Sequence, residues 1–301
     1  MTRNIVLPFS ITGSDAARAR FPLRSRDPAL LTRLTSDWCL DATVAVGHAS
    51  GTLPADAAAL GAGGLVNLAN NSPLAIPAGL RGAVSCVANG AAPSFSNSGA
   101  GNRGINRNGE ATSAGLRIAK VGIADVDVGH PPSEGFLDFL FLIWARPSAL
   151  NYWSLAGCSN NNFGADMVKF WGITCNGGGA VQESLSGRGL AGLAAGTWAQ
   201  IGSHYSYNTG SGAILVRSFI NGGEVNAGLA ATPVATTTAA MAAAISTATK
   251  SWIGSNGIDP CFKGLIGRAE RILTGLPGNS LDPLALVVAD FAVNRARIAG
   301  L

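Results

Sequence analysis

The stretch that decides the fold class reads Ile214-Leu215-Val216-Arg217-Ser218-Phe219-Ile220-Asn221-Gly222-Gly223. Its first seven residues alternate, with aliphatic side chains and one serine on one face and Leu215, Arg217 and Phe219 on the other. This period of two predicts a β-strand over 214–220, and an Asn-Gly pair directly after a strand is typical of a two-residue hairpin turn. We therefore expect a β-rich body around residues 197–273.

The most apolar segment of the chain, residues 136–147, predicts a second strand. It is rich in aromatic and aliphatic residues, is about a dozen residues long and ends at Pro147. A segment of that length is too short to span a bilayer. A continuous apolar run closed by proline favours a central strand buried on both faces, and a buried helix is the alternative.

The composition points to an ordered, sparsely charged protein. The chain has 301 residues, of which 47% are apolar and 13% are charged, against a typical charged share of about 25%. This balance is the opposite of that in disordered proteins. A surface so poor in charge suggests contact with other chains, and we expect a homo-oligomer. Without a long apolar segment at the N-terminus or elsewhere, we expect neither a cleaved secretion signal nor membrane insertion.

The excess positive charge is concentrated at the N-terminus. Residues 1–33 hold six arginines and two aspartates and account for the whole net charge of +4. We interpret this basic arm as an anchor for assembly, with Arg18, Arg20, Arg24 and Arg26 as its contact residues. Nucleic acid is the alternative partner, but no nucleic-acid-binding motif accompanies the arginines, so we do not expect it.

The remaining segments complete the predicted organisation. Residues 89–108 are almost devoid of large apolar side chains and predict a long surface loop. Residues 283–292 predict a helix capped by Ser280 or Asp282. We thus divide the chain into a basic arm (1–40), a loop-rich segment (41–110), a sandwich (111–279) and a C-terminal helix (280–301). The five widely spaced cysteines predict buried free thiols.

Four pieces of the sequence, in this order, resemble the concanavalin A-like (laminin-G-like) jelly-roll family. They are an apolar strand ending in Trp-Ala-Arg-Pro (139–147), Gly-Thr-Trp (196–198), the strand with its Asn-Gly (214–222), and Trp-Ile-Gly followed by Phe-Lys-Gly-Leu-Ile (252–254 and 262–266). The resemblance covers residues 112–275. It implies an all-β fold, an antiparallel two-sheet jelly-roll sandwich, here with a less regular N-terminal segment and a C-terminal helix.

The resemblance also implies a choice between sugar binding and glycoside hydrolysis, since the family contains both. Hydrolysis needs paired carboxylates, and the candidates are Asp125 with Asp127 and Glu134 with Asp138. Neither pair completes the family's Glu-x-Asp-x-x-Glu pattern. His48, His130 and His204 lie far apart without metal-binding spacing, and no Gly-x-Ser-x-Gly motif is present. We therefore expect a protein without catalytic residues, with a glycosidase as the alternative.

Aromatic and amide side chains mark the candidate glycan site. Sugar recognition pairs an aromatic platform with hydrogen-bonding groups, and the residues that meet this description are Tyr152, Trp153, Asn160, Asn161, Asn162 and Trp171. The alternative is that the aromatics belong to the core and the asparagines to turns. No cofactor is expected, although calcium could bind Asp166 with the three asparagines, or Asp125 with Asp127. The alternative is that these are solvated turn residues.

These observations lead to a functional hypothesis. We interpret the chain as a non-enzymatic structural protein of a tailed bacteriophage virion, assembled in the host cytoplasm. It would sit on the tail or baseplate, or with the fibres, contact other virion proteins and bind a host-surface glycan. The alternatives are a capsid decoration protein, and a glycan-binding module or glycoside hydrolase of a cell. The placement in a virion is an analogy at the level of the fold family.

Overall fold

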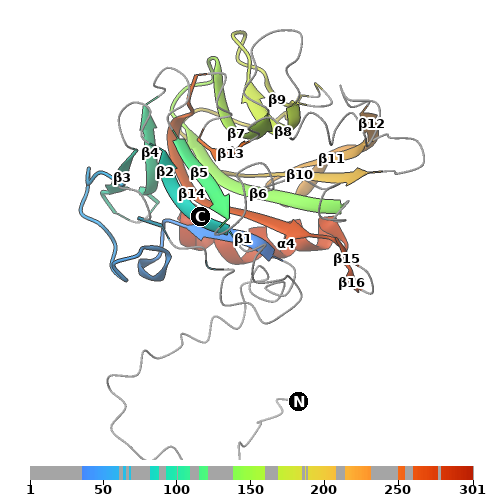
Figure 1. Ribbon diagram of the computed structural model, residues 1–301. Helices are drawn as coiled ribbons and strands as arrows, with labels where there is room; N and C mark the ends of the chain where they lie inside the picture. The colour runs from blue at the N-terminus through green and yellow to red at the C-terminus, as the bar shows by residue number, and fades with distance from the viewer. Residues whose placement is uncertain are drawn as a thin grey trace, which may run out of the picture.

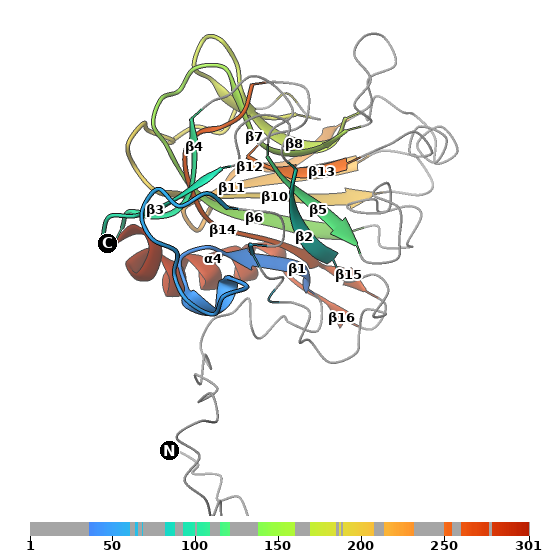
Figure 2. The same cartoon turned by 60° about the vertical axis from the view of Figure 1, so that its left-hand side comes forward.

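The computed structural model describes residues 36–60, 64–65, 68, 82–87, 93–99, 101–108, 115–120, 138–159, 169–184, 187, 189–207, 214–231, 250–254, 260–276 and 279–300. These residues form two antiparallel sheets that face each other, with one helix on the outside (Figures 1 and 2). The structure confirms the predicted two-sheet β-sandwich with a C-terminal helix.

The larger sheet has eight strands in the order β12-β11-β10-β6-β14-β4-β3, with β1 also paired to β14. Its strands are β1 (Ser36–Asp41), β3 (Ser94–Asn97), β4 (Arg103–Asn108), β6 (Asp138–Pro147), β10 (Ala199–Tyr207), β11 (Ile214–Ile220), β12 (Gly223–Ala231) and β14 (Lys263–Leu273). A register shift between Ile266 and Arg268 divides β14. Before this shift β14 pairs with β4, and after it with β1, so both neighbours share one edge of the strand.

The smaller sheet has six strands in the order β2-β5-β13-β7-β8-β9. They are β2 (Gly82–Val87), β5 (Gly115–Lys120), β7 (Trp153–Ser159), β8 (Lys169–Cys175), β9 (Val181–Glu183) and β13 (Lys250–Ile253). A two-stranded ribbon of β15 (Gly275–Leu276) and β16 (Asn279–Ser280) follows β14. A short 3-10 turn, η2 (Ala45–Gly47), follows β1.

Strand β6 is buried on both faces, as its apolar run predicts. One face contributes Phe139, Phe141 and Ile143 to the main core between the sheets. The other face contributes Leu140 and Leu142 to a second apolar cluster on the outside of the sheet. Each such side chain stabilises the fold by roughly 1.5–3 kcal/mol when it is buried. A central position in the sheet, covered on both faces, is therefore favourable for β6.

The helix α4 (Pro283–Asn294) provides the cover on the outer face, and the π-helical turn η6 (Arg295–Ala299) continues it. Figure 1 shows α4 on the side of the larger sheet that faces away from β7, β8 and β13. Asp282 caps the helix by accepting a hydrogen bond from the Leu284 N–H at 3.1 Å, with Pro283 in the first turn. Of the two predicted caps, Asp282 is the one that the structure uses.

The Asn-Gly turn predicted after residue 220 joins β11 to β12. Ile220 pairs with Gly223, which leaves Asn221 and Gly222 as the two-residue loop. Both have positive φ angles, +50° and +83°, as a type I′ hairpin turn requires. The turn is held by Gln200 of β10, whose Oε1 accepts a hydrogen bond from the Gly222 N–H at 3.0 Å.

A buried carboxylate connects this sheet to α4. Asp290 accepts hydrogen bonds from Trp144 Nε1 at 2.8 Å, Gln200 Nε2 at 2.6 Å and Asn294 Nδ2 at 2.7 Å. The donors come from β6, β10 and the helix itself. Donors from both the sheet and the helix satisfy this buried carboxylate, and the contact therefore fixes the position of α4 on the sheet.

Buried ion pairs continue this contact toward β1. Arg268 lies between Glu270, at 2.8 Å, and Asp41, at 3.3 Å, and its Nε is 3.7 Å from Asp290. Arg297 of η6 also pairs with Asp41 at 2.8 Å. Burial alone would raise the pKa of Asp41, but Arg297 and Arg268 outweigh burial and hold it below its ordinary value.

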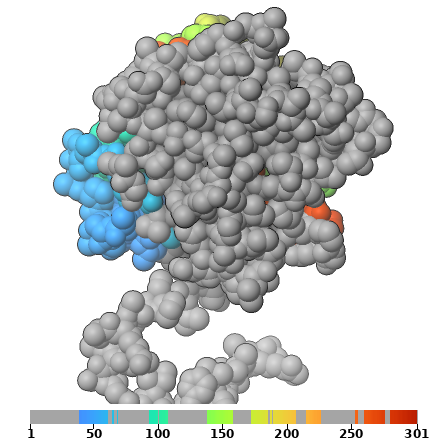
Figure 3. All heavy atoms as spheres, viewed as in Figure 1, coloured from blue at the N-terminus to red at the C-terminus, as the bar shows by residue number. Residues whose placement is uncertain are grey.

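Two predictions about the first half of the chain are wrong. Residues 94–108 do not form one long loop, because β3 and β4 make an antiparallel hairpin whose Phe95 and Ile105 are buried in the main core. The sandwich also does not begin at residue 111, since β1, β3 and β4 belong to the larger sheet and β2 to the smaller one. The segment that follows β1 lies on one side of the molecule, where Figure 3 shows it in blue, and contributes Ala42 and Leu60 to the main core.

Three cysteines fall within the described side chains, Cys39, Cys175 and Cys261, and all three are buried free thiols, as predicted. The basic arm, with Arg18, Arg20, Arg24 and Arg26, lies outside the described residues. No helix among the residues that the structure describes is long and apolar enough to cross a membrane.

Candidate functional site

The candidate site lies where the outer face of the larger sheet emerges from beneath the helix. Along β6, the outward side chains Leu140, Leu142 and Trp144 are covered by α4 and η6. The next outward residue, Arg146, is only partly buried. The sheet therefore continues past the end of its helical cover, and its uncovered part carries polar groups.

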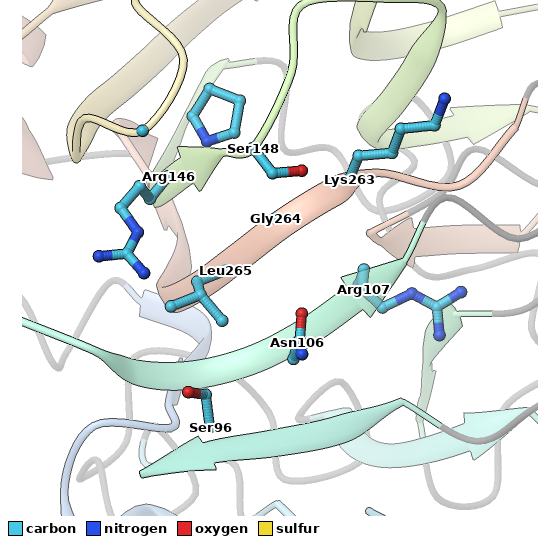
Figure 4. A pocket seen from close by; sticks show the side chains of 10 residues that line it. Ser96, Asn106, Arg107, Arg146, Ser148, Lys263, Gly264 and Leu265 are labelled. Carbon is cyan, nitrogen blue, oxygen red and sulfur yellow. The ribbon is translucent and has the colours of Figure 1, made fainter. Parts of the chain in front are cut away.

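A pocket of about 550 Å³ occupies this uncovered part (Figure 4). Arg146, Leu265 and Asn106 are register partners on β6, β14 and β4, so they form a row across three strands. One pleat further along, Ser148 and Lys263 are neighbours, since the Ser148 N–H donates to the Lys263 carbonyl at 2.8 Å. The lining is completed by Ser96, Arg107, Pro147, Gly196 and Gly264.

Arg146 is held in place by three contacts. Its Nη1 donates hydrogen bonds to the Gly101 carbonyl at 3.1 Å and to Asn102 Oδ1 at 2.6 Å. Its guanidinium carbon lies 5.7 Å from the centre of the Trp198 ring, within the range of a cation–π contact. Nε and Nη2 donate no hydrogen bond to any of the described residues, and they can therefore donate to solvent or to a ligand.

A second hollow, of about 320 Å³, lies on the other side of Arg146. It shares Arg146 and Gly196 with the first and adds Gly101, Asn102, Thr197, Trp198 and Ala299 to the lining. The two hollows therefore form one groove with Arg146 at its middle. We call this the Arg146 groove.

Lys263 connects the groove to an exposed aromatic residue. Its Nζ donates to Asn151 Oδ1 at 3.3 Å. The next residue, Tyr152, is 51% exposed and has a φ angle of +31°. A bulky residue with positive φ is rare and marks a site that the surrounding structure holds against strain. Tyr152 is thus next in sequence to the residue that Lys263 contacts, and neither Asn151 nor Tyr152 is among the described residues that line the two hollows.

The floor of the groove requires glycine at position 264. Gly264 has a φ angle of +139°, and a Cβ at this position would lie 2.1 Å from the Arg146 carbonyl oxygen. Any larger residue would have to separate β14 from the end of β6. This close approach places Lys263 beside Ser148 and so shapes the first hollow.

The chemistry of the groove is that of hydrogen bonding and positive charge. Its lining offers hydroxyl, amide, guanidinium and ammonium groups, and the part of the lining that the structure describes contains no carboxylate. Arg107 lies on the opposite pleat of β4 and is buried, and Figure 4 shows its side chain directed away from Asn106. Across the described part of the chain, no group of three or more His, Cys, Asp or Glu side chains could hold a metal ion.

A separate polar cluster lies near the start of α4 but offers no cavity. His204 Nε2 lies 3.1 Å from Thr274 Oγ1, and the imidazole is buried. Burial lowers the pKa of His204 to about 4, a shift that the nearby Asp138 carboxylate opposes and Arg217 reinforces. His204 pairs with Leu140 in the sheet register, on the outer face of the larger sheet, and is buried there.

The predicted glycan residues are not brought together as one site. Trp153 is 1% exposed, and its indole packs edge-on against Phe262 in the core, so it cannot be a sugar platform. This result matches the alternative interpretation of that residue. Trp171 belongs to β8, and only its backbone is described. Asn160, Asn161 and Asn162 lie outside the described residues, as do Asp125, Asp127, Glu134 and Asp166.

Sequence reasoning missed the Arg146 groove because its residues come from six separate segments, spread from residue 96 to residue 299. One signal was available in the sequence. Arg146 interrupts the apolar run of β6 on the same pleat face as Leu140, Leu142 and Trp144. A charged residue that continues an apolar face marks the point where the covering element ends.

Comparison with known proteins identifies no family. No protein-family model and no curated protein matches the chain. Similar solved structures include domain 4 of the arabinanase AbnA from Geobacillus stearothermophilus in complex with arabinotriose, at 16% identity and a TM-score of 0.40. That match covers 70% of this chain and 88% of the arabinanase domain.

Two further likenesses span only part of larger chains. Trypanosoma rangeli sialidase matches at 9% identity and a TM-score of 0.43, over 73% of this chain and 30% of the sialidase. The binding domain of botulinum neurotoxin DC in complex with rat synaptotagmin II matches at 9% identity and a TM-score of 0.42, over 86% of this chain and 52% of that chain. Likenesses at this level agree with a β-sandwich, and we draw no functional argument from them.

Proposed function

We propose that the protein is a non-enzymatic glycan-binding protein and that its ligand lies in the Arg146 groove. The observation that carries the proposal is the uncovered end of the outer sheet face, where hydroxyl, amide and cationic groups converge in a pocket of about 550 Å³. Ser96, Ser148 and Asn106 supply neutral donors and acceptors on neighbouring strands. A saccharide presents hydroxyl groups in comparable density, and a rigid sheet positions its partners accurately.

Tyr152 is the aromatic residue that we propose as a contact beside this groove. It is exposed, unlike the neighbouring Trp153, and Asn151 beside it accepts a hydrogen bond from Lys263. An exposed tyrosine on a strained backbone offers a ring face against which a sugar can stack. Trp171 belongs to β8 of the smaller sheet and is not part of this proposed site, and Asn160, Asn161 and Asn162 stay predictions.

Binding is proposed over hydrolysis because of the groups that line the groove. Glycoside hydrolysis needs two carboxyl groups on either side of the scissile bond, and the described lining of both hollows contains none. The residues of the groove bind and orient, and none is placed to donate a proton to a leaving oxygen at neutral pH.

Screening the full chain on a broad glycan array, followed by isothermal titration with the best ligands, tests this function. We expect Asn106→Ala and Ser148→Ala each to weaken binding about fivefold, the effect of one neutral hydrogen bond. Ser280→Ala, an exposed serine on β16, is the matched control and should leave the affinity unchanged. A folded wild type that binds no glycan, or that releases reducing sugar from the array ligands, would overturn the proposal.

We further propose that this binding serves attachment of a tailed bacteriophage virion, on the tail, baseplate or fibres, with residues 1–40 as the anchor to other virion proteins. The basic arm and the low charge content of the chain support this role. A virion component is expected to form trimers or higher symmetric assemblies. Light scattering on the purified chain tests it: a symmetric oligomer supports the virion role, and a monomer at high concentration argues for a cellular glycan-binding module.

A further inference from the structure

We propose that the Arg146 groove selects a negatively charged glycan, whose carboxylate or sulfate group is bound by Arg146, with Lys263 as a second cation of the first hollow. This inference rests on the proposed glycan-binding function and adds the class of ligand. A uronic acid and a sulfated sugar share the chemistry in question, an anionic oxygen cluster on a saccharide ring.

The charges of the lining support this selection. Arg146 and Lys263 both line the first hollow, and no aspartate or glutamate is among the described residues that line either hollow. Within the described residues neither cation has an acidic partner within ion-pair distance, whereas Arg217 pairs with Glu224, and Arg268 and Arg297 with Asp41. The ion-pairing capacity of the two groove cations is thus open to a ligand.

The guanidinium of Arg146 is oriented before any ligand arrives. Hydrogen bonds from Nη1 to Gly101 and Asn102 and the contact with Trp198 restrict its rotation. Nε and Nη2 lie on the opposite edge of the planar group and have the spacing for a bidentate contact with a carboxylate or sulfate. An ordinary solvated arginine would lose rotational freedom on binding, and this one has already lost it on folding.

The hollows on both sides of Arg146 indicate an oligosaccharide rather than a single sugar. Volumes of about 550 Å³ and 320 Å³ meet at this residue. The second hollow is lined by neutral groups apart from Arg146, namely Asn102, Thr197 and backbone of Gly101 and Ala299 with the edge of Trp198. We therefore place the anionic group at Arg146 and neutral sugar units in the hollows on either side of this residue.

A nucleic acid is the competing polyanion, and the groove favours it less. Binding of single-stranded nucleic acid uses exposed aromatic faces on which bases stack. Tyr152 offers one exposed ring beside the groove, whereas successive bases stack on several. Trp198, which lines the groove, is buried, and its Nε1 donates to the Gly101 carbonyl at 2.6 Å. Its ring face is directed to Arg146, so it has no room for a base.

The test compares three oligosaccharides of equal length with the full chain in isothermal titration: a trigalacturonate, a sulfated trisaccharide and neutral maltotriose. A single-stranded oligonucleotide is the fourth probe. We expect one of the two anionic sugars to bind at least tenfold more tightly than maltotriose, and its affinity to fall with rising salt. Arg146→Gln and Lys263→Gln should each weaken that binding about tenfold.

Arg295→Gln is the control, because it removes the same charge from an exposed position on η6, where Arg295 contacts Phe291. It should change the affinity less than twofold. Maltotriose binding as tight as that of both anionic sugars, or anionic binding that neither groove variant weakens, would overturn the charge selection and leave the glycan-binding function standing. Tighter binding of the oligonucleotide, with the same dependence on Arg146 and Lys263, would overturn it in favour of nucleic acid. If no sugar binds at all, the proposed function itself fails.

Discussion

Arg146 and Asn102 lie 44 positions apart in the chain and are joined by a hydrogen bond of 2.6 Å from Nη1 to Oδ1. The bond connects the end of β6 to the turn before β4, at the boundary between the two hollows. It gives Arg146 one fixed orientation in a groove that otherwise lies open to solvent, and it makes Asn102 a positioning residue for the proposed ligand contact.

Replacing Asn102 with alanine tests this positioning. Without the Oδ1 acceptor the guanidinium gains rotational freedom, and we expect glycan affinity to fall about threefold to fivefold, the effect of one hydrogen bond. The melting temperature should change little, because both residues are partly exposed. Asn102→Asp keeps the acceptor and should restore the orientation but add a competing negative charge, which weakens an anionic ligand and not a neutral one. Unchanged affinity in Asn102→Ala would contradict the positioning role.

Removing the buried carboxylate of Asp290 should strongly destabilise the protein. In Asp290→Ala the donors Trp144 Nε1, Gln200 Nε2 and Asn294 Nδ2 lose their acceptor, and Arg268 loses one of its three acidic neighbours. Breaking a buried charged contact costs about 3–5 kcal/mol. Urea denaturation measures this loss. Val288→Ala on the same helix, at a position 49% exposed, is the control, with an expected change below about 0.5 kcal/mol.

The hairpin turn gives a second stability test. Gly222 has a φ angle of +83°, and a Cβ there would lie 3.1 Å from the Phe291 ring. Gly222→Ala should therefore cost about 1–2 kcal/mol, from backbone strain and from contact with α4. Gly177→Ala is the matched control, since its φ is not positive and a Cβ there would meet nothing within 4 Å. Equal unfolding free energies for the two variants would mean that the turn does not support the helix.

The buried histidine predicts a loss of stability in mild acid. The pKa of His204 is about 4 in the folded protein and about 6.5 in an unfolded chain. Between these values the unfolded chain binds a proton that the folded one does not, so stability falls as the pH falls. From pH 7 to pH 5 the loss from this residue is about 2 kcal/mol.

Comparing the wild type with His204→Gln over pH 7 to 5 isolates this contribution, because the variant keeps every other titrating group. We expect the wild type to lose about 2 kcal/mol more than the variant over this range. Asp41 does not interfere, since its pKa is lowered from 3.8 and its contribution is lost only at more acidic pH. If the free energies of unfolding of the two proteins changed in parallel with pH, protonation of His204 would not destabilise the fold.

The sandwich could be predicted where local pattern and burial agree. Alternation from Ile214 to Ile220 with Asn221-Gly222 specified a hairpin, the apolar run of β6 specified a strand covered on both sides, and Asp282-Pro283 specified a helix start. Each of these signals lies within a dozen consecutive residues. Local sequence is sufficient to predict these elements because the residues that form each element also carry its pattern.

Features that depend on distant partners could not be predicted. The segment 94–108 contains only Phe95 and Ile105 as large apolar residues, yet pairing with β14 makes two strands of it. Tyr152 and Trp153 are neighbours in sequence, and only the packing of Phe262 decides that one is exposed and the other buried. The Arg146 groove combines β3, β4, β6 and β14, whose adjacency is a property of the whole sheet.

The most direct test of the proposed binding site is a titration of isotope-labelled protein with the best-binding oligosaccharide, followed by amide chemical shifts in a TROSY spectrum. We predict that the largest changes occur at Asn102, Asn106, Arg146, Ser148 and Lys263, with smaller changes at Tyr152. The amides of β8 and β9, on the other sheet, should not move. Saturable changes confined to the smaller sheet, or distributed without relation to the groove, would contradict the assignment of the Arg146 groove as the glycan site.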